Sequence, residues 1–266
     1  MRRVLRFEHR RMLLAKSYRY SLLFGGMMAL WHFVECFIIQ RQYTDEPLPL
    51  IQSFLGGDIQ TSIPELYRII IPLLATIPYA WGYMSDYKSG YLKSLYLYVD
   101  RMKLLTARYL VCVEAGGLCA VFPLIFSLIL SAPFYPNYKP RIFLLYGGPP
   151  AGSAFADSYY LHPLLYIMFY MLLAFIIGCI FASIGLLFGL FVKSRIQVLA
   201  IPMLLLLYWS VVCQQLGIKK ISFKEMLLPF EGVWIGPFFL IVGVCIVTTF
   251  LLFTYIGKRK DVLGDM

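Results

Sequence analysis

The sequence predicts an all-α integral membrane protein with six transmembrane helices, on the basis of its composition, its apolar runs and the placement of its charges. Hydrophobic residues make up 60% of the 266 residues and charged residues 14%, whereas soluble domains are about half apolar and about one quarter charged. The mean hydropathy is +0.74. Several apolar runs reach the roughly 20 residues that a helix needs to cross a bilayer. These features exclude an ordinary soluble domain.

Residues 1–20 predict an amphipathic helix that lies on the inner membrane surface. They carry seven basic residues against one acid, Glu8. The apolar residues near one face of this helix are Val4, Phe7, Leu14 and Tyr18. A basic helix with one apolar face is typical of an interfacial segment. Because no small-residue cleavage site follows the first apolar run, we do not expect a signal peptide.

Six apolar segments follow and make up a transmembrane domain over residues 21–256. The expected spans lie near 21–40, 66–84, 104–131, 164–192, 197–216 and 234–256. The links predicted to face outward are 41–65, 132–163 and 217–233. The last of these, near 217–233, is amphipathic and has an apolar cluster from Met226 to Phe230. A short tail, 257–266, follows the sixth span.

The positions of lysine and arginine predict that both termini are cytoplasmic. In this orientation the inner segments hold seven basic residues at the N-terminus, four between the second and third spans, two at the 193–195 corner and three in the tail, sixteen altogether. The outer loops hold six. The positive-inside rule therefore favours this topology in a plasma or inner membrane. The net charge of +10 flanks the spans, so it indicates attraction to anionic lipid rather than nucleic-acid binding.

The fourth span has a row of small residues on one face. They are Ala174, Gly178, Ala182, Gly185 and Gly189. The last two form a G-x-x-x-G pair, and small residues allow helix backbones to approach closely in lipid. We interpret this face as a helix-packing surface.

No catalytic or metal-binding signature is present in the sequence. It contains neither a phosphate-binding loop, nor a dinucleotide-binding glycine motif, nor H-E-x-x-H. The three histidines are scattered and the six cysteines form no C-x-x-C pair. We therefore expect no metal and no catalytic residue, and any driven work must draw on an ion gradient or on another chain.

Ionisable groups are costly within a span and often functional, and apart from Arg68 and Arg108 at span edges the candidates are His32, Glu35 and Glu114. His32 and Glu35 share a face of the first span at a spacing of three residues. Glu114 is the deepest carboxylate, roughly 15 Å into the third span by the helical rise. Two interpretations remain open for each acid. Glu35 is either a structural acid near the surface or part of a polar pathway, and Glu114 is either an interhelical hydrogen-bonding group or a pathway or gate residue.

The inner loop between the second and third spans predicts a short helix near 86–101. The loop opens with Asp86, and Gly90 follows four residues later. The residues expected to form an apolar face are Leu92, Leu95, Tyr96 and Val99. Arg101 and Lys103 come toward the end. A solvated connection does not need an apolar face, whereas a helix that docks on a partner does.

This pattern resembles the permease subunits of ABC transporters of the ABC-2 type. The resemblance covers nearly the whole chain and is most specific in the loop, where an acidic residue, three further residues and a glycine precede a short coupling helix and then a basic residue. Here Asp86 and Gly90 match the opening, Tyr91 to Tyr98 match the helix and Arg101 matches the basic position. The sequence departs from the family pattern in having Asp where Glu is usual and in lacking the proline that often precedes the basic residue.

The resemblance implies a non-catalytic permease that works as a pair, with a second copy or a different permease, above two ABC ATPase subunits. ATP and Mg²⁺ would bind in those partners, and the exported substrate would be an amphipathic peptide, lipid or drug-like molecule. The rival hypothesis is an ion-coupled secondary transporter that uses Glu114 or Glu35 as its proton site. Such carriers usually show inverted repeats, which are not visible in this sequence.

Overall fold

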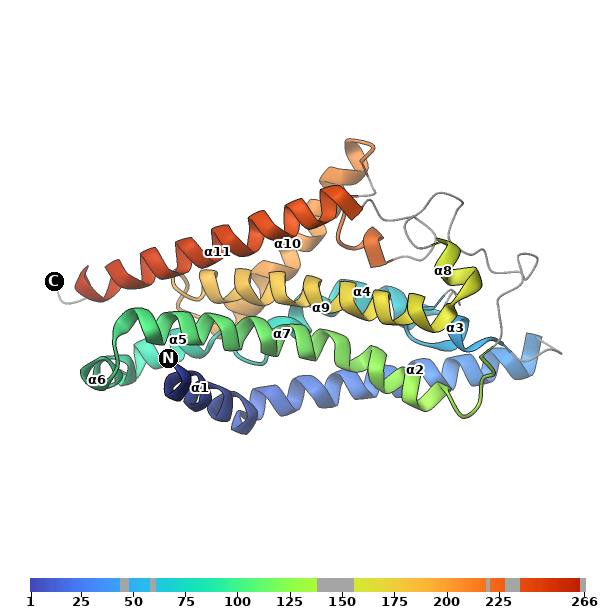
Figure 1. The fold of residues 1–266 in the computed structure, drawn as a ribbon, viewed down its shortest axis with the longest axis horizontal. Coiled ribbons are helices and arrows are strands. Elements are labelled where there is room, and N and C mark those ends of the chain that lie inside the picture. The colour runs from blue at the N-terminus through green and yellow to red at the C-terminus, as the bar shows by residue number, and fades with distance from the viewer. Residues whose placement is uncertain (44–47, 58–60, 138–155, 219–220, 228–234, 264–266) are drawn as a thin grey trace.

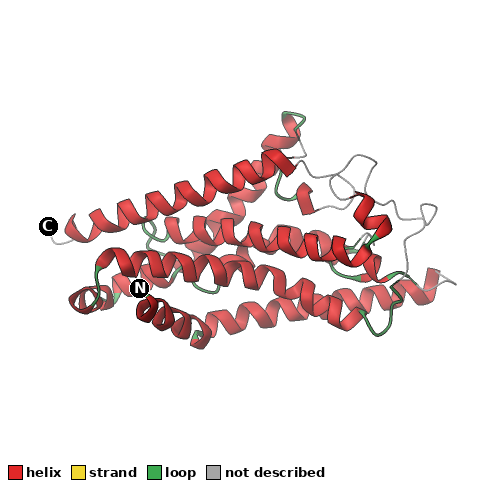
Figure 2. Ribbon diagram, in the orientation of Figure 1, coloured by secondary structure: helices red, strands yellow, loops and turns green. Residues whose placement is uncertain are grey.

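The computed structural model describes residues 1–43, 48–57, 61–137, 156–218, 221–227 and 235–263. Over these residues the chain is helical with no strand, which confirms the all-α class (Figure 2). The long helices are α2 (Lys16–Tyr43), α7 (Arg101–Ser131), α9 (Pro163–Phe188), α10 (Arg195–Gln215) and α11 (Ile235–Leu263). The short ones are α1 (Arg2–Leu14), α3 (Leu50–Ser53), α4 (Ser62–Thr76), α5 (Gly82–Lys88), α6 (Tyr91–Tyr98), α8 (Ala156–Leu161) and the 3-10 helix η2 (Glu225–Leu227).

Five of the described helices are long and apolar enough to cross a membrane. They are α2, α7, α9, α10 and α11. On their outer faces large apolar side chains such as Met27, Tyr208 and Leu240 are more than 60% exposed. Many exposed large apolar side chains on long helices are unfavourable in water and are expected where helices face lipid. The prediction of an integral membrane protein is therefore supported.

The second predicted span, 66–84, is not one continuous helix. Helix α4 ends at Thr76 after 15 residues, a turn covers residues 77–81, and α5 follows. Pro78 explains the break, since it has no N–H to donate to the carbonyl of Leu74 four residues earlier. The hydroxyl of Ser21 on α2 donates to that carbonyl instead, at 2.9 Å. The expected count of six uninterrupted membrane-spanning helices is therefore reduced to five in the described residues.

Helices α7 and α9 form the centre of the bundle, and their backbones meet at small residues. A Cβ on Gly178 would lie 2.5 Å from Ala120 Cβ and 2.9 Å from the carbonyl oxygen of Gly116. On the same face Gly185 approaches Thr76 of α4, whose Cγ2 would be 2.6 Å from its Cβ. The face described by Ala174, Gly178, Ala182, Gly185 and Gly189 thus lies against α7 and α4. Close backbone approach of this kind allows extensive dispersion contacts in lipid.

Both ends of the described chain lie at one end of the bundle, together with α6 (Figure 1). The Lys193 corner is at this end as well, because its carbonyl accepts a hydrogen bond from the Lys88 ammonium. The amphipathic helix expected over 1–20 is α1, which stops at Leu14 because Ala15 is extended, and α2 begins directly afterwards. Both termini, α6 and the Lys193 corner therefore share one end of the bundle, as the charge distribution predicts.

Parts of two predicted outer links are buried within the opposite end of the bundle and are not exposed loops. Helix α3 is wholly buried, and the backbone N–H of Leu55 donates to the Ser127 hydroxyl of α7. Phe223, from the link before α11, packs edge-on against Phe181 of α9. Met226 and Leu227 of the expected apolar cluster are buried, while Leu228 to Phe230 lie outside the described residues. These segments close the bundle because their backbone polar groups find partners inside it.

Candidate functional site

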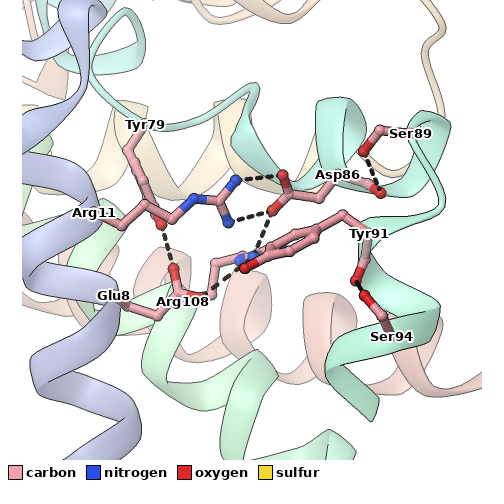
Figure 3. Close-up of polar contacts among 8 residues, drawn as sticks. All are labelled: Glu8, Arg11, Tyr79, Asp86, Ser89, Tyr91, Ser94 and Arg108. Carbon is pink, nitrogen blue, oxygen red and sulfur yellow. Dashed lines mark hydrogen bonds and ion pairs between the residues drawn. The ribbon is translucent and has the colours of Figure 1, made fainter. Parts of the chain in front are cut away.

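The site begins with four charged side chains that meet at the α6 end of the bundle. Glu8 and Arg11 come from one face of α1, Asp86 from α5 and Arg108 from α7 (Figure 3). Arg11 donates to both carboxylate oxygens of Asp86. Arg108 Nη2 donates to Asp86 Oδ2 at 2.6 Å and to Glu8 Oε1 at 3.3 Å. We call Glu8, Arg11, Asp86 and Arg108 the charge cluster.

The charge cluster is balanced and largely removed from solvent. Its two acids and two bases cancel, and the side chains of Glu8, Asp86 and Arg108 are 0%, 6% and 1% exposed. The Tyr79 hydroxyl, from the turn after α4, donates to the second oxygen of Glu8. The hydrogen bonds that Arg11 donates to Asp86 raise the pKa of Arg11 above its ordinary value. Every charge in the cluster therefore has an opposite partner, which is the condition under which buried ions are tolerated.

Helix α6 is joined to the charge cluster through Asp86 and the turn that follows α5. Gly90 has a φ of +73°, a backbone conformation that side chains disfavour, and it reverses the chain between the two helices. Helix α6 ends at Val99, which is extended, and Asp100 then caps α7 by accepting from the Met102 N–H. Arg101 is consequently the first residue of α7, where it donates to the Lys258 carbonyl at 3.1 Å, and does not belong to the short helix.

The apolar face that the sequence predicts for docking is turned toward this chain. Leu92 is 2% exposed, and Leu95, Tyr96 and Val99 pack half-buried against the same core. The side chains that reach outward are instead Leu97 and Tyr98, which are 82% and 87% exposed, with Tyr91 at 40%. The apolar face predicted for docking is therefore the face that attaches α6 to the bundle, and the free face of α6 carries Leu97 and Tyr98. Whether α6 docks on a partner remains a prediction.

Asp86 also differs from its expected position. The sequence suggests a charge that favours the start of the docking helix, but Asp86 lies inside α5 and both of its oxygens are bound by arginines. It is 4% exposed. Asp86 is therefore an internal attachment point for the α5–α6 turn and offers no free charge to a partner.

Glu114 lies beside α1, away from the interior of the bundle. Its carboxylate accepts from His9 Nε2 at 2.7 Å, and its side chain is 49% exposed. Helix α7 has 31 residues and is about 46 Å long, which exceeds the roughly 30 Å of hydrocarbon, so its early turns can reach the level of α1. The depth estimated from the sequence assumes that the hydrocarbon begins at residue 104, whereas a helix longer than the hydrocarbon can have its first turns outside it.

The pairing of His9 with Glu114 predicts a pH-dependent attachment of α1. Burial lowers the pKa of His9, but the hydrogen bonds that His9 donates to the Glu114 carboxylate and the Leu5 carbonyl outweigh this effect and raise the pKa above 6.5. The stabilisation is therefore fully present below pH 6.5 and is lost as the pH rises through the raised pKa. We expect the thermal unfolding midpoint of the wild type to fall between pH 6 and pH 8 by more than that of His9→Gln. Equal pH profiles for the two proteins, or a Glu114→Gln variant that keeps the full dependence, would contradict this assignment.

The other two residues singled out within the first span lie near the opposite end. His32 is fully buried and contacts Cys36 Sγ at 3.5 Å. Glu35 Oε1 accepts from Trp31 at 2.9 Å and from Ser62 at 2.9 Å, so it ties α2 to the start of α4. Among the described residues no hydrogen bond or ion pair joins His32 to Glu35, although they are three positions apart, and the partners of Glu35 fit the structural interpretation of this acid.

No group of three metal-ligating side chains occurs among the residues that the structure describes. The sequence matches no protein-family model, and none of the curated proteins is significantly similar to it. The family relationship suggested by the Asp86 and Gly90 motif therefore remains a hypothesis, and the site has to be interpreted from its own geometry.

Sequence reasoning missed three members of this site, namely Glu8, Arg11 and Arg108. By the expected bounds Arg108 lies at the edge of the third span, yet it is the largest fully buried side chain of the described residues. An arginine seven residues inside an apolar helix is a signal that it requires an anionic partner. Its partners were not recognisable, because they lie 100 and 22 positions away along the chain.

Proposed function

We propose that this chain is the non-catalytic membrane subunit of an ATP-driven exporter of the ABC-2 type, and that α6 docks on a separate ATPase. The observation that carries the proposal is the geometry of α6. This short helix sits at the end of the bundle that holds both termini, exposes Leu97 and Tyr98 almost completely, and is attached inward by Leu92. Large apolar side chains that project from a fixed helix are typical anchors for a groove on a partner.

A hollow beside α6 adds to this surface. It has a volume of about 560 Å³ and is lined by Arg11, Asp86, Ser89, Gly90, Tyr91 and Ser94. Polar side chains, namely Arg11, Asp86, Ser89 and Ser94, contribute to this lining, as is usual at the rim of a docking interface, while Leu97 and Tyr98 supply the apolar contact. Both parts belong to the segment that resembles the coupling helix.

The charge cluster is suited to carry movement of α6 into the bundle. A displacement of α6 pulls on Asp86, whose arginine partners lie on α1 and α7. Arg108 holds both acids through Nη2 and its Nε and Nη1 atoms have no hydrogen-bond partner in the described part of the chain. These unused donors allow Glu8 and Asp86 to change which nitrogen of the Arg108 guanidinium each of them binds. A switch between two such arrangements can transmit a conformational change from one site to another.

The proposal includes a sixth crossing made by α4, the turn at 77–81 and α5. Ser62 lies beside Glu35 and Pro78 lies beside Ser17, so this segment runs antiparallel to α2 over 18 residues of that helix. That distance is about 27 Å by the helical rise, close to the hydrocarbon thickness. With six crossings both termini face the cytoplasm of a cell-membrane protein, and the exposed apolar faces of α10 and α11 are available to a second permease copy.

The rival proposal of an ion-coupled carrier has less support. Glu114 is half-exposed and paired with His9, and Glu35 is held by Trp31 and Ser62. Neither acid lines the hollow beside α6 or the cavity between Arg11 and Arg195. The substrate of the exporter is proposed only as an amphipathic molecule.

Co-purification with a co-expressed candidate ABC ATPase, and stimulation of the ATP hydrolysis of that ATPase, test the proposal. Leu97→Asp and Tyr98→Asp should each weaken association at least tenfold. Burying an anchor of this size contributes about 1.5–3 kcal/mol, and about 1.4 kcal/mol corresponds to one decade. Both side chains are exposed in the free chain, so neither change should impair folding.

The matched control is Ile218→Asp, which introduces the same charge at an exposed apolar position just after α10, far from α6. It should leave association and hydrolysis unchanged. If both α6 variants, and also Gly90→Val, retained wild-type association and hydrolysis, α6 would not be the coupling element and the carrier hypothesis would move ahead.

A further inference from the structure

A second cavity lies on the other side of Arg11, where α1 gives way to α2. It has a volume of about 480 Å³, within the roughly 300–1,000 Å³ typical of small-molecule sites. Its walls come from the α1–α2 junction, the turn after α4, α5 and the start of α10. The charged and aromatic lining residues are Arg11, Lys16, Tyr20, Tyr79, Trp81 and Arg195. Among the described residues that line it there are three cations and no carboxylate.

Two of these cations are not committed to an acid. Arg11 is bound to Asp86, but no ion pair of Lys16 or Arg195 occurs in the described part of the chain. The Arg195 guanidinium instead stacks over the Trp81 ring, 4.2 Å from its centroid. This stacking orients the guanidinium at the cavity wall and leaves its N–H groups available, and a planar fork of N–H donors binds phosphate oxygens well.

The cavity also lies at the level where lipid headgroups are expected. Lys16 and Arg195 are the first residues of two of the five helices that can cross a membrane. The positive ends of both helix dipoles therefore point toward the same side as these cations. Tryptophan and tyrosine, as in Trp81 and Tyr20, are the residue types that favour this boundary.

An apolar path leads away from the cavity along α2. Tyr20 at the rim is followed at helical spacing by Leu23 and Met27, and the three side chains are 64%, 63% and 67% exposed. They lie on one strip of the helix, directed from the charged end into the membrane-spanning part. A ligand that combines a phosphate group with a hydrocarbon chain matches both the cavity and this strip.

We propose that this cavity binds the phosphate group of an anionic phospholipid, with an acyl chain lying along Leu23 and Met27 of α2. The site is distinct from the docking surface on α6, and it does not depend on the identity of the transported substrate. Free phosphate has the same headgroup chemistry but gains nothing from the apolar strip. Occupancy by lipid would hold the α1–α2 junction against α10, because Lys16 and Arg195 would share one ligand.

Native mass spectrometry of the full-length protein, titrated with phosphatidylglycerol or phosphatidylcholine, tests this proposal. The wild type should retain one phosphatidylglycerol molecule per chain in preference to phosphatidylcholine. The Lys16→Gln/Arg195→Gln double variant should bind phosphatidylglycerol with an affinity at least about tenfold lower. Each basic residue near an anionic headgroup contributes somewhat less than about one decade of affinity. Millimolar inorganic phosphate should not displace the bound lipid.

The matched control is Lys103→Gln/Arg259→Gln, which removes the same charge from exposed positions outside the cavity. It should keep the wild-type affinity. Equal losses in the two double variants would show diffuse attraction and overturn the proposal, as would displacement of the lipid by phosphate or equal retention of phosphatidylcholine. Because Lys16 and Arg195 are exposed, both double variants should unfold at the wild-type temperature in phosphatidylcholine; should the cavity double variant fail to fold, Arg195→Gln alone carries the same test.

Discussion

Replacing Arg108 by methionine is expected to destabilise the protein by about 3–5 kcal/mol, the largest effect of any single charge change in the described chain. The change leaves Glu8 buried with only the Tyr79 hydroxyl as a partner and removes one of the two cations bound to Asp86. Breaking a buried pair by removing one partner costs this much because an uncompensated charge remains in a medium of low polarity. Unfolding by sodium dodecyl sulfate in mixed micelles, followed by circular dichroism, measures the difference.

Lys103→Met is the matched control for Arg108→Met. It removes a cation from the same helix, but its pair with Asp100 spans 3.9 Å and both side chains are more than half exposed. Such a surface pair contributes about 0–1 kcal/mol. If the two variants unfolded alike, the charge cluster would not be a buried ionic unit. Glu8→Gln/Arg108→Met, which removes the orphaned charge as well, should recover part of the lost stability.

Substituting Gly178 by leucine should disrupt the centre of the bundle. The new side chain meets Ala120 of α7 at 2.5 Å and the Gly116 carbonyl at 2.9 Å, and the latter is backbone that cannot rotate away. Overpacking in a well-packed interior costs roughly 1–3 kcal/mol and more where a backbone has to move. Separation of α7 from α9 is therefore expected, seen as a lower unfolding midpoint and loss of the monodisperse elution peak.

Gly243→Leu provides the comparison for that substitution. Gly243 lies in α11, and no heavy atom lies within 4 Å of a Cβ placed there. Helix propensity changes equally in the two variants, so any difference between them reports the contact of α7 with α9. Equal unfolding midpoints would mean that the small-residue face of α9 does not hold the two helices together.

Much of the membrane architecture was predictable because it follows from local properties of the chain. The length of an apolar run and its helical period depend only on neighbouring residues. Five of the expected spans therefore match α2, α7, α9, α10 and α11 to within a few residues. The larger differences are at the start of α2 and the end of α11. The row of small residues from Ala174 to Gly189 was visible for the same reason. The partners of that row, Gly116 and Ala120, were not, since a pattern on one helix does not say which helix lies against it.

The sequence predicted the candidate site only as a continuous segment of the chain, without the residues from other helices that contact it. The acid, the glycine and the short helix that follows stand together in the sequence, and α6 indeed begins directly after Gly90. Which side of α6 is free depends on what the bundle covers. Helical spacing favoured Leu92, Leu95, Tyr96 and Val99 as the free face, but these residues pack against the core, and Leu97 and Tyr98 remain exposed.

The sequence by itself determined that this chain is helical, that it enters a membrane, and that its termini and basic loops share one side, because these depend on composition, period and charge counted along the chain. Only the tertiary structure decided how the second span is interrupted, where the far-end links fold inward, and which acids hold Arg108. In each case the deciding group lies far away in the sequence: Ser21 supplies the hydrogen bond that Pro78 cannot make, and Arg11 reaches Asp86 across 75 positions. A buried polar group must find a partner wherever the fold brings one, and local pattern carries no information about that partner.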